Sequence, residues 1–80
     1  KKNYGRLAQR IIEVLDELYV ATTLDDIPTS PPDRRHKITG LDYTWSIDLS
    51  RNYRMLIESL KINDPKSVTF VVIKDILDDH

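Results

Sequence analysis

The spacing of the apolar residues changes once along the chain, and this change constrains the fold more than any other feature. In residues 4–19 the apolar residues recur at intervals that place them on one face of a helix. They are Leu7, Ile11, Val14, Leu15 and Leu18. In residues 42–49 apolar and polar residues alternate instead, which is typical of a strand with one buried and one solvated face. The pattern therefore predicts an amphipathic helix followed by a sheet.

A proline-containing loop separates the two patterns. Its prolines are Pro28, Pro31 and Pro32, and proline removes a backbone donor and disfavours helix in the residue before it. Just before them, residues 22–26 carry a threonine followed three positions later by an aspartate. This spacing matches a capping box and predicts a short second helix.

Further strands are predicted at residues 35–38, 53–58 and 67–73, with a hairpin turn at residues 50–52. Residues 67–73 are apolar on both faces, which favours a central position in the sheet. The predicted fold is α+β, with an N-terminal helix and a short second helix packed on an antiparallel β-meander sheet. The length of 80 residues predicts one small domain, residues 1–80.

The composition narrows the functional classes. The chain has no cysteine, so it has neither a disulfide framework nor a thiolate zinc site, which agrees with the reducing cytoplasm where we expect the protein to act. The longest apolar run, residues 70–73, is far shorter than a membrane span, and no signal peptide is visible. With 12 Lys and Arg against 13 Asp and Glu, any nucleic-acid site must be a local basic patch.

The densest basic run is Arg34-Arg35-His36-Lys37, and Arg51 and Arg54 lie across the neighbouring hairpin. If the strands pair in sequence order, Arg54 can face the same surface as His36 and Lys37. Guanidinium and ammonium groups together suit an RNA backbone. A solvated edge strand protected by charge is the commoner explanation of such a run.

The chain has two histidines, His36 and His80, and both are candidates for proton transfer because imidazole titrates near neutral pH. RNA cleavage through the 2′-hydroxyl needs a base, an acid and a cation, and His36, His80 and Arg54 can fill these roles. Asp78 can orient a histidine or act as a base. Alternatively, a terminal histidine is idle and an acidic tail serves solubility. Since the spacing of His36, Asp78 and His80 matches no zinc pattern, we expect no metal and no cofactor.

Several short stretches, taken in order, resemble one protein family. The ordered stretches are residues 6–11, residues 21–27, His36-Lys37-Ile38-Thr39-Gly40, Trp45-Ser46-Ile47, Asn52-Tyr53-Arg54 and the terminal Asp78-Asp79-His80. In this order and spacing, the chain resembles the HigB toxins of the RelE superfamily, which belong to bacterial toxin–antitoxin pairs. The resemblance covers nearly the whole chain, and its specificity comes from the ordered set rather than from any single stretch.

The resemblance implies a RelE-like domain and a metal-independent endoribonuclease that cleaves mRNA during translation on the ribosome. It also implies a cytoplasmic protein that is neutralised by a cognate HigA-type antitoxin with a helix-turn-helix domain, and that has no membrane partner. By the same resemblance His36, Asp78 and His80 are catalytic and Arg54 contacts the scissile phosphate. Position and charge add RNA or ribosome contacts at Arg35, Lys37 and Arg51.

The chain departs from the family pattern at three places. Asp79 stands where the family usually has tyrosine, and Thr39 stands where it usually has lysine. Family members also usually carry a strand before the helix, and none precedes Tyr4 here. These departures favour an alternative, in which a catalytically weakened toxin homologue acts as an antitoxin-binding or co-repressor protein.

Overall fold

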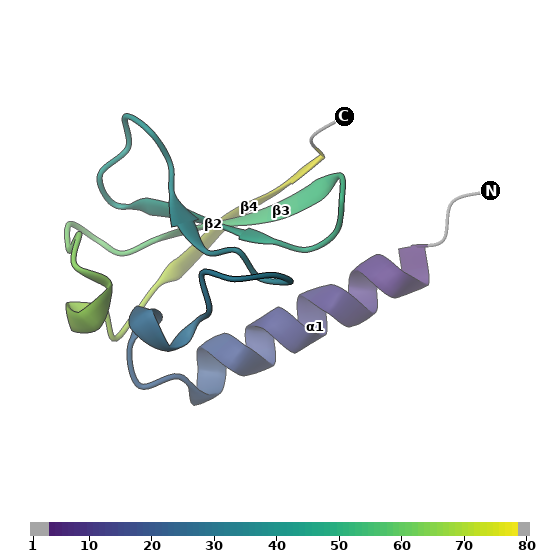
Figure 1. Cartoon of the computed structure of the whole chain (residues 1–80), viewed down its shortest axis with the longest axis horizontal. Coiled ribbons are helices and arrows are strands. Elements are labelled where there is room, and N and C mark those ends of the chain that lie inside the picture. The colour runs from purple at the N-terminus through teal and green to yellow at the C-terminus, as the bar shows by residue number, and fades with distance from the viewer. Residues whose placement is uncertain (1–3, 79–80) are drawn as a thin grey trace.

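The computed structural model describes residues 4–78, which form one helix packed on a four-stranded antiparallel sheet. Along the chain the elements are the helix α1 (Tyr4–Val20), the 3-10 helix η1 (Leu24–Asp26), the strands β1 (His36–Lys37), β2 (Thr44–Asp48) and β3 (Tyr53–Glu58), the 3-10 helix η2 (Pro65–Ser67) and the strand β4 (Val72–Asp78). Figure 1 shows α1 lying along one side of the sheet. The predicted class, a helix on an antiparallel sheet, is confirmed.

The strands pair in the order β1-β2-β3-β4, so the sheet is a meander, as predicted. His36 pairs with Ser46, Ser46 pairs with Leu56, and Leu56 pairs with Asp75. These four residues form one row across the sheet, and directly opposite residues of paired strands share a face. The register therefore determines which functional side chains can meet.

The core lies between α1 and the adjacent face of the sheet. Its buried apolar residues are Val14, Leu24, Ile27, Trp45, Ile47, Leu49, Met55, Ile57 and Val68. Full burial of one such side chain contributes roughly 1.5–3 kcal/mol. The predicted helix stripe is confirmed at Val14, with Leu7, Ile11 and Leu18 packed against the core. It is wrong at Leu15, which is 41% exposed because no other element within residues 4–78 buries it.

The predicted short second helix is confirmed as η1. The Asp26 carboxylate accepts hydrogen bonds from the backbone N–H of Thr22 at 2.8 Å and of Thr23 at 3.4 Å. These bonds satisfy donors that a helix start leaves unpaired. The capping pattern thus works at Thr23 and Asp26.

The last strand differs from the prediction. Residues 67–73 were expected to form a central strand, but β4 spans Val72–Asp78 and lies at an edge of the sheet. The apolar run has a different origin: Val68 is buried in the core before the strand begins, whereas Phe70 is 67% exposed. Asp75 and Asp78 therefore belong to a strand and not to a solubilising tail.

Within residues 4–78, none of the helices combines the length and the apolar content that crossing a bilayer requires.

Candidate functional site

His36 and Arg54 lie on the face of the sheet opposite α1. His36 is paired with Ser46, and Arg54 is paired with Asp48, two residues further along β2. Because side chains alternate along a strand, Ser46 and Asp48 share a face, and so do their partners. Strand spacing and rise put the two Cα atoms about 12 Å apart. A phosphodiester between the two side chains can therefore contact both.

The orientation of His36 is set by its own loop. Its Nδ1 atom lies 2.8 Å from the backbone oxygen of Arg34, and the ring is exposed. A carbonyl oxygen only accepts, so we assign the proton of the neutral ring to Nδ1. This tautomer leaves Nε2 as a proton acceptor, which is the state that a general base requires.

The charge around Arg54 is mixed. Asp48 stands directly opposite Arg54, and its Oδ2 atom accepts a hydrogen bond from Nη1 of Arg34 at 3.1 Å. Arg51 is exposed in the turn between β2 and β3. Together with His36, Arg34 and Arg54 form a basic patch that Asp48 partly neutralises.

Two residues expected at this patch do not belong to it. Arg35 is only 8% exposed; its Nε atom donates to the backbone oxygen of Ile27 at 2.8 Å, and its guanidinium lies 3.5 Å from Asp25. These bonds attach the loop to η1 and leave Arg35 unable to bind RNA at the surface. Lys37 is paired with Trp45 on the α1 side of the sheet, with Nζ 5.5 Å from the centre of the indole ring. The expectation that Lys37 faces the same surface as Arg54 is therefore wrong.

Asp78 ends β4 and is paired with Tyr53, whereas Arg54 is paired with Leu77. Because adjacent residues of a strand point to opposite faces, Asp78 lies on the α1 side while Arg54 lies on the other side. His80 lies outside the described residues, so its expected meeting with His36 stays a prediction. Of the four predicted catalytic residues, the described part of the chain brings His36 and Arg54 to one face.

The sequence pattern gave a wrong prediction for Ser46, which lies on the same face of the sheet as His36 and Arg54. The alternation predicts a solvated side chain, but Ser46 is fully buried, and its Oγ atom has no hydrogen-bond partner within residues 4–78. It lies in the row between His36 and Leu56. Larger neighbours cover so small a side chain, which hydrophobic periodicity does not anticipate.

A cluster of charges that the sequence did not reveal attaches the preceding loop to α1. Asp33 is 2% exposed, and its Oδ1 atom lies 2.6 Å from Nη2 of Arg10, which also donates to the backbone oxygen of Asp48 at 3.0 Å. Burial, a hydrogen bond to Asp33 and the negative charge of Asp33 raise the pKa of Glu17 from 4.5 to about 6. The Oδ2 atom of Asp33 is buried and has no hydrogen-bond partner within residues 4–78.

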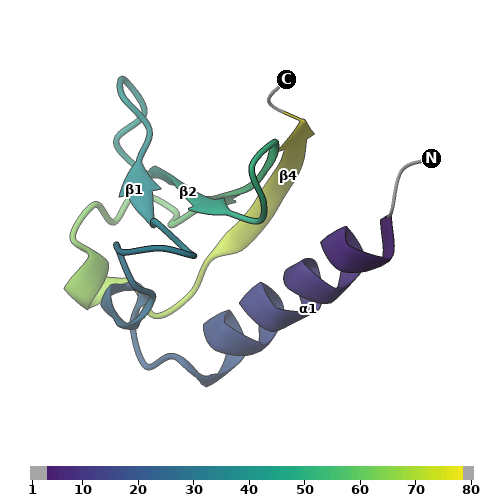
Figure 2. The ribbon, with the colours of Figure 1, turned by 45° about the vertical axis from the view of Figure 1, so that its right-hand side comes forward.

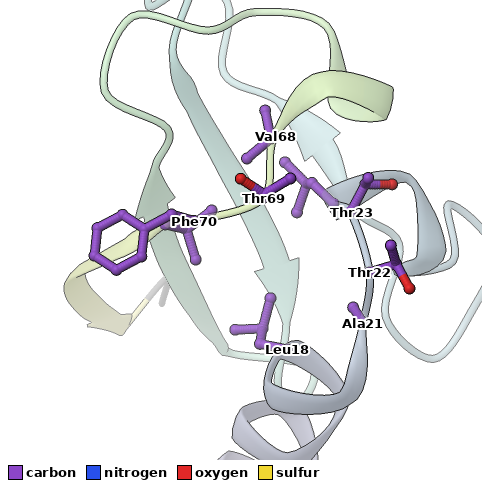
Figure 3. Close-up of a pocket in the computed structure, with 9 residues that line it drawn as sticks. Leu18, Ala21, Thr22, Thr23, Val68, Thr69 and Phe70 are labelled. Carbon is purple, nitrogen blue, oxygen red and sulfur yellow. The ribbon is translucent and has the colours of Figure 1, made fainter.

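A small pocket lies between the end of α1, η1 and residues 68–71 (Figure 3). Its volume is about 50 Å³, which suffices for a few water molecules but not for a nucleotide. Leu18 and Val68 line it together with threonine hydroxyls, and no titratable side chain does. We therefore do not consider it a candidate catalytic site.

No group of three His, Asp or Glu side chains within residues 4–78 is arranged to hold a metal ion. Comparison with protein-family models, with curated proteins and with solved structures finds no match to the chain.

Proposed function

We propose that this chain is a HigB-type toxin with a RelE-like fold, which cleaves mRNA on the ribosome as a metal-independent endoribonuclease. The observation that carries the proposal is that His36 and Arg54 share the sheet face opposite α1. Both residues belong to the ordered stretches that resemble the family. A helix on an antiparallel meander agrees with the expected architecture.

In the proposed reaction, a base takes the proton of the 2′-hydroxyl, and the 2′ oxygen attacks the adjacent phosphorus. The bond from phosphorus to the 5′ oxygen breaks, and an acid protonates that oxygen. The products are a 2′,3′-cyclic phosphate and a 5′-hydroxyl. His36 and His80 share the acid and base roles, and the guanidinium of Arg54 stabilises the charge that develops on the phosphoryl oxygens.

Asp78 has a different role in this scheme. It lies on the α1 side of the sheet and is paired with Tyr53, the residue before Arg54. From there it cannot transfer a proton on the face of His36. We therefore assign Asp78 to positioning the end of the chain that carries His80.

The proposed partners are mRNA on the ribosome and a HigA-type helix-turn-helix antitoxin in the cytoplasm. Arg34, which contacts Asp48, extends the positive charge around His36 and Arg54, so RNA phosphates are expected to bind there. Arg51, exposed in the turn between β2 and β3, is proposed as a further RNA contact. Arg35 and Lys37, whose side chains lie elsewhere, are not included in this RNA surface.

The test is translation-dependent cleavage of a reporter mRNA by the parent and by Arg54→Gln, His36→Gln and His80→Ala. Each variant is expected to lose activity about 100-fold or more, because each removes a proton-transfer or charge-stabilising group. Lys66→Gln is the matched control, since Lys66 is an exposed cation on η2. Thermal unfolding of each variant checks that the fold is retained.

Unchanged cleavage by both Arg54→Gln and His80→Ala would remove the assigned site. Loss of cleavage by Lys66→Gln to the same extent would mean that general positive charge, rather than this face, decides activity.

One observation favours the alternative, a catalytically weakened homologue that binds an antitoxin or acts as a co-repressor. Asp48 stands opposite Arg54 and so lowers the positive charge offered to a phosphate. Growth after induced expression without antitoxin distinguishes the two functions: arrest favours the enzyme, and normal growth favours the binding protein. Restored toxicity in Asp79→Tyr would identify the end of the chain as the defect.

A further inference from the structure

The strand β4 has an unpaired outer edge. It is the last strand in the order β1-β2-β3-β4, and β3 is the only strand within residues 4–78 that pairs with it. Figure 2 shows β1 and β4 along opposite margins of the sheet. Six of the seven residues of β4 are exposed. An exposed strand of this length offers backbone donors and acceptors to another strand.

The sequence of β4 is complementary to itself in one antiparallel register. A two-fold axis between Lys74 and Asp75 places Lys74 of one copy opposite Asp75 of the other, and the reverse contact repeats the pairing. The flanking pairs in this register are apolar, with Ile73 opposite Ile76 and Val72 opposite Leu77. Opposite charges and apolar pairs across strands each stabilise a sheet.

The bulge in β4 makes this register geometrically possible. Leu56 of β3 is paired with Asp75 and the next residue is paired with Ile73, so Lys74 is an extra residue in β4. In a regular strand Ile73 and Ile76, three positions apart, point to opposite faces. The extra residue puts both on the α1 side, as their core partners on β3 require. When two copies of β4 pair in this register, the residues directly opposite each other therefore lie on the same face of the joined sheet.

The same argument holds for the outer apolar pair. Val72 is paired with Glu58 and Leu77 with Arg54, and Glu58 and Arg54 share a face of β3. Val72 and Leu77 therefore lie together on the face opposite α1. They are 37% and 38% exposed, so both have surface left to bury against a partner.

An apolar flank of α1 lies on the same side of the molecule as β4. Arg10 contacts Asp33 and Asp48, which belong to the β1–β2 side of the sheet. Tyr19 is nine positions, or two and a half turns, from Arg10 and so projects to the other side. The exposed side chains of this flank are Ile12, Leu15 and Tyr19.

We propose that two copies of this chain associate through β4 in this register, joining their sheets into one continuous sheet. A two-fold axis perpendicular to the sheet keeps both α1 helices on the same face, with their apolar flanks towards each other. The lysine and the bulge are features by which edge strands discourage unspecific pairing. Lys74 contacts Glu58 of its own chain at 3.9 Å, and in this register it also faces the carboxylate of Asp75 of the second copy. This added pairing of opposite charges makes the contact specific for a second copy.

The test measures the mass of the full chain in solution from about 5 to about 200 µM, by sedimentation or light scattering. The parent, of 9.3 kDa, is expected to shift to twice this mass with increasing concentration. Lys74→Asp and Asp75→Lys each put like charges together at two symmetric positions and are each expected to weaken the dimer roughly 30-fold. Lys66→Asp, on η2, is the control and should associate like the parent.

The decisive measurement is the mixture of the two single variants. The acidic pair of Lys74→Asp then faces the basic pair of Asp75→Lys, so the mixture is expected to form heterodimers at concentrations where each variant alone does not associate. Because Asp75 also accepts a hydrogen bond from the backbone of Ile76 at 2.8 Å, thermal unfolding of both variants checks their stability.

Three results would overturn the proposal: a parent that stays monomeric throughout, a dimer that neither charge reversal weakens, or a mixture that does not associate. A parent that stays monomeric would mean that any strand pairing with the outer edge of β4 has a different sequence from β4. The proposal is independent of nuclease activity, because association is measured without RNA.

Discussion

Replacing Glu17 with glutamine tests how the loop before His36 is attached to α1. Glu17 shares the buried carboxylate of Asp33 with Arg10, and the pKa of Glu17 is raised from 4.5 to about 6. A protonated Glu17 donates a hydrogen bond to Asp33, whereas an ionised Glu17 brings a second negative charge close to it. The amide of glutamine is a donor at every pH.

The sign of the pH effect follows from the raised pKa. Between pH 4.5 and about 6, the folded chain keeps a proton that the unfolded chain loses, so the free energy of unfolding falls as the pH rises. The difference between 4.5 and about 6 corresponds to about 2 kcal/mol. Because the Glu17 side chain is 38% exposed, solvent screening reduces the expected effect to about 1 kcal/mol.

Glu17→Gln is therefore expected to unfold like the parent near pH 4 and to be about 1 kcal/mol more stable above pH 6. For a domain of this size, that difference raises the melting temperature by roughly 4–8 °C. Urea unfolding of both proteins at about pH 4, 6 and 8 measures the difference directly. Glu13→Gln is the matched control, since Glu13 lies one turn earlier and also contacts Arg10, at 3.6 Å.

If the free energies of unfolding of the parent and of Glu17→Gln change in parallel with pH, then Glu17 does not hold a proton against Asp33 in the folded chain. An equal effect of Glu13→Gln would mean that the charge on α1, rather than the contact with Asp33, determines the pH dependence.

Three further predictions concern stability and the boundary of the RNA surface. Arg35→Met is expected to cost about 1–3 kcal/mol in urea unfolding, because it leaves the buried backbone oxygen of Ile27 without its donor. Met55→Ala is expected to cost about 2–5 kcal/mol in the same measurement, whereas Leu15→Ala should cost less than about 1 kcal/mol, since Met55 is fully buried and Leu15 is exposed. Lys37→Gln is expected to leave reporter cleavage unchanged, because its ammonium lies over the indole on the α1 side.

Elements encoded by a local period were predictable from the sequence. The helix ends at Val20, one residue beyond the predicted end, and the third strand was predicted at its observed bounds of Tyr53–Glu58. The hairpin turn fixes the register between β2 and β3, so the pairing in sequence order also followed. Each of these features depends on residues close together in the chain, where periodicity and turn chemistry are informative.

The last strand could not be predicted because its period is broken. The extra residue Lys74 changes the alternation, so Ile73 and Ile76 share a face although they are three positions apart. Reading a period of two through this point assigns one of them to the wrong face. The pairing with β3, a tertiary feature, is what defines the bulge.

The candidate site was only partly predictable for a related reason. The basic run at residues 34–37 looks like one patch in the sequence, yet its members serve different parts of the fold. Arg34 pairs with Asp48, Arg35 attaches the loop to η1, and Lys37 lies against the indole ring of the core. Only the alternation of His36 and Lys37 could have been read in advance, since adjacent strand residues face opposite ways.

The near balance of charge therefore says little about RNA binding by this chain. A cation that holds the fold together contributes little to an RNA surface. Arg10 and Arg35 illustrate this, because their guanidinium groups donate hydrogen bonds to the Asp33 carboxylate and to backbone oxygens of Asp48 and Ile27. What a phosphate meets is the local set around His36, where arginines outnumber the carboxylate of Asp48. The arrangement of cations on one face, rather than their total, thus determines whether an acidic polymer can bind, and the register of the sheet determines that arrangement.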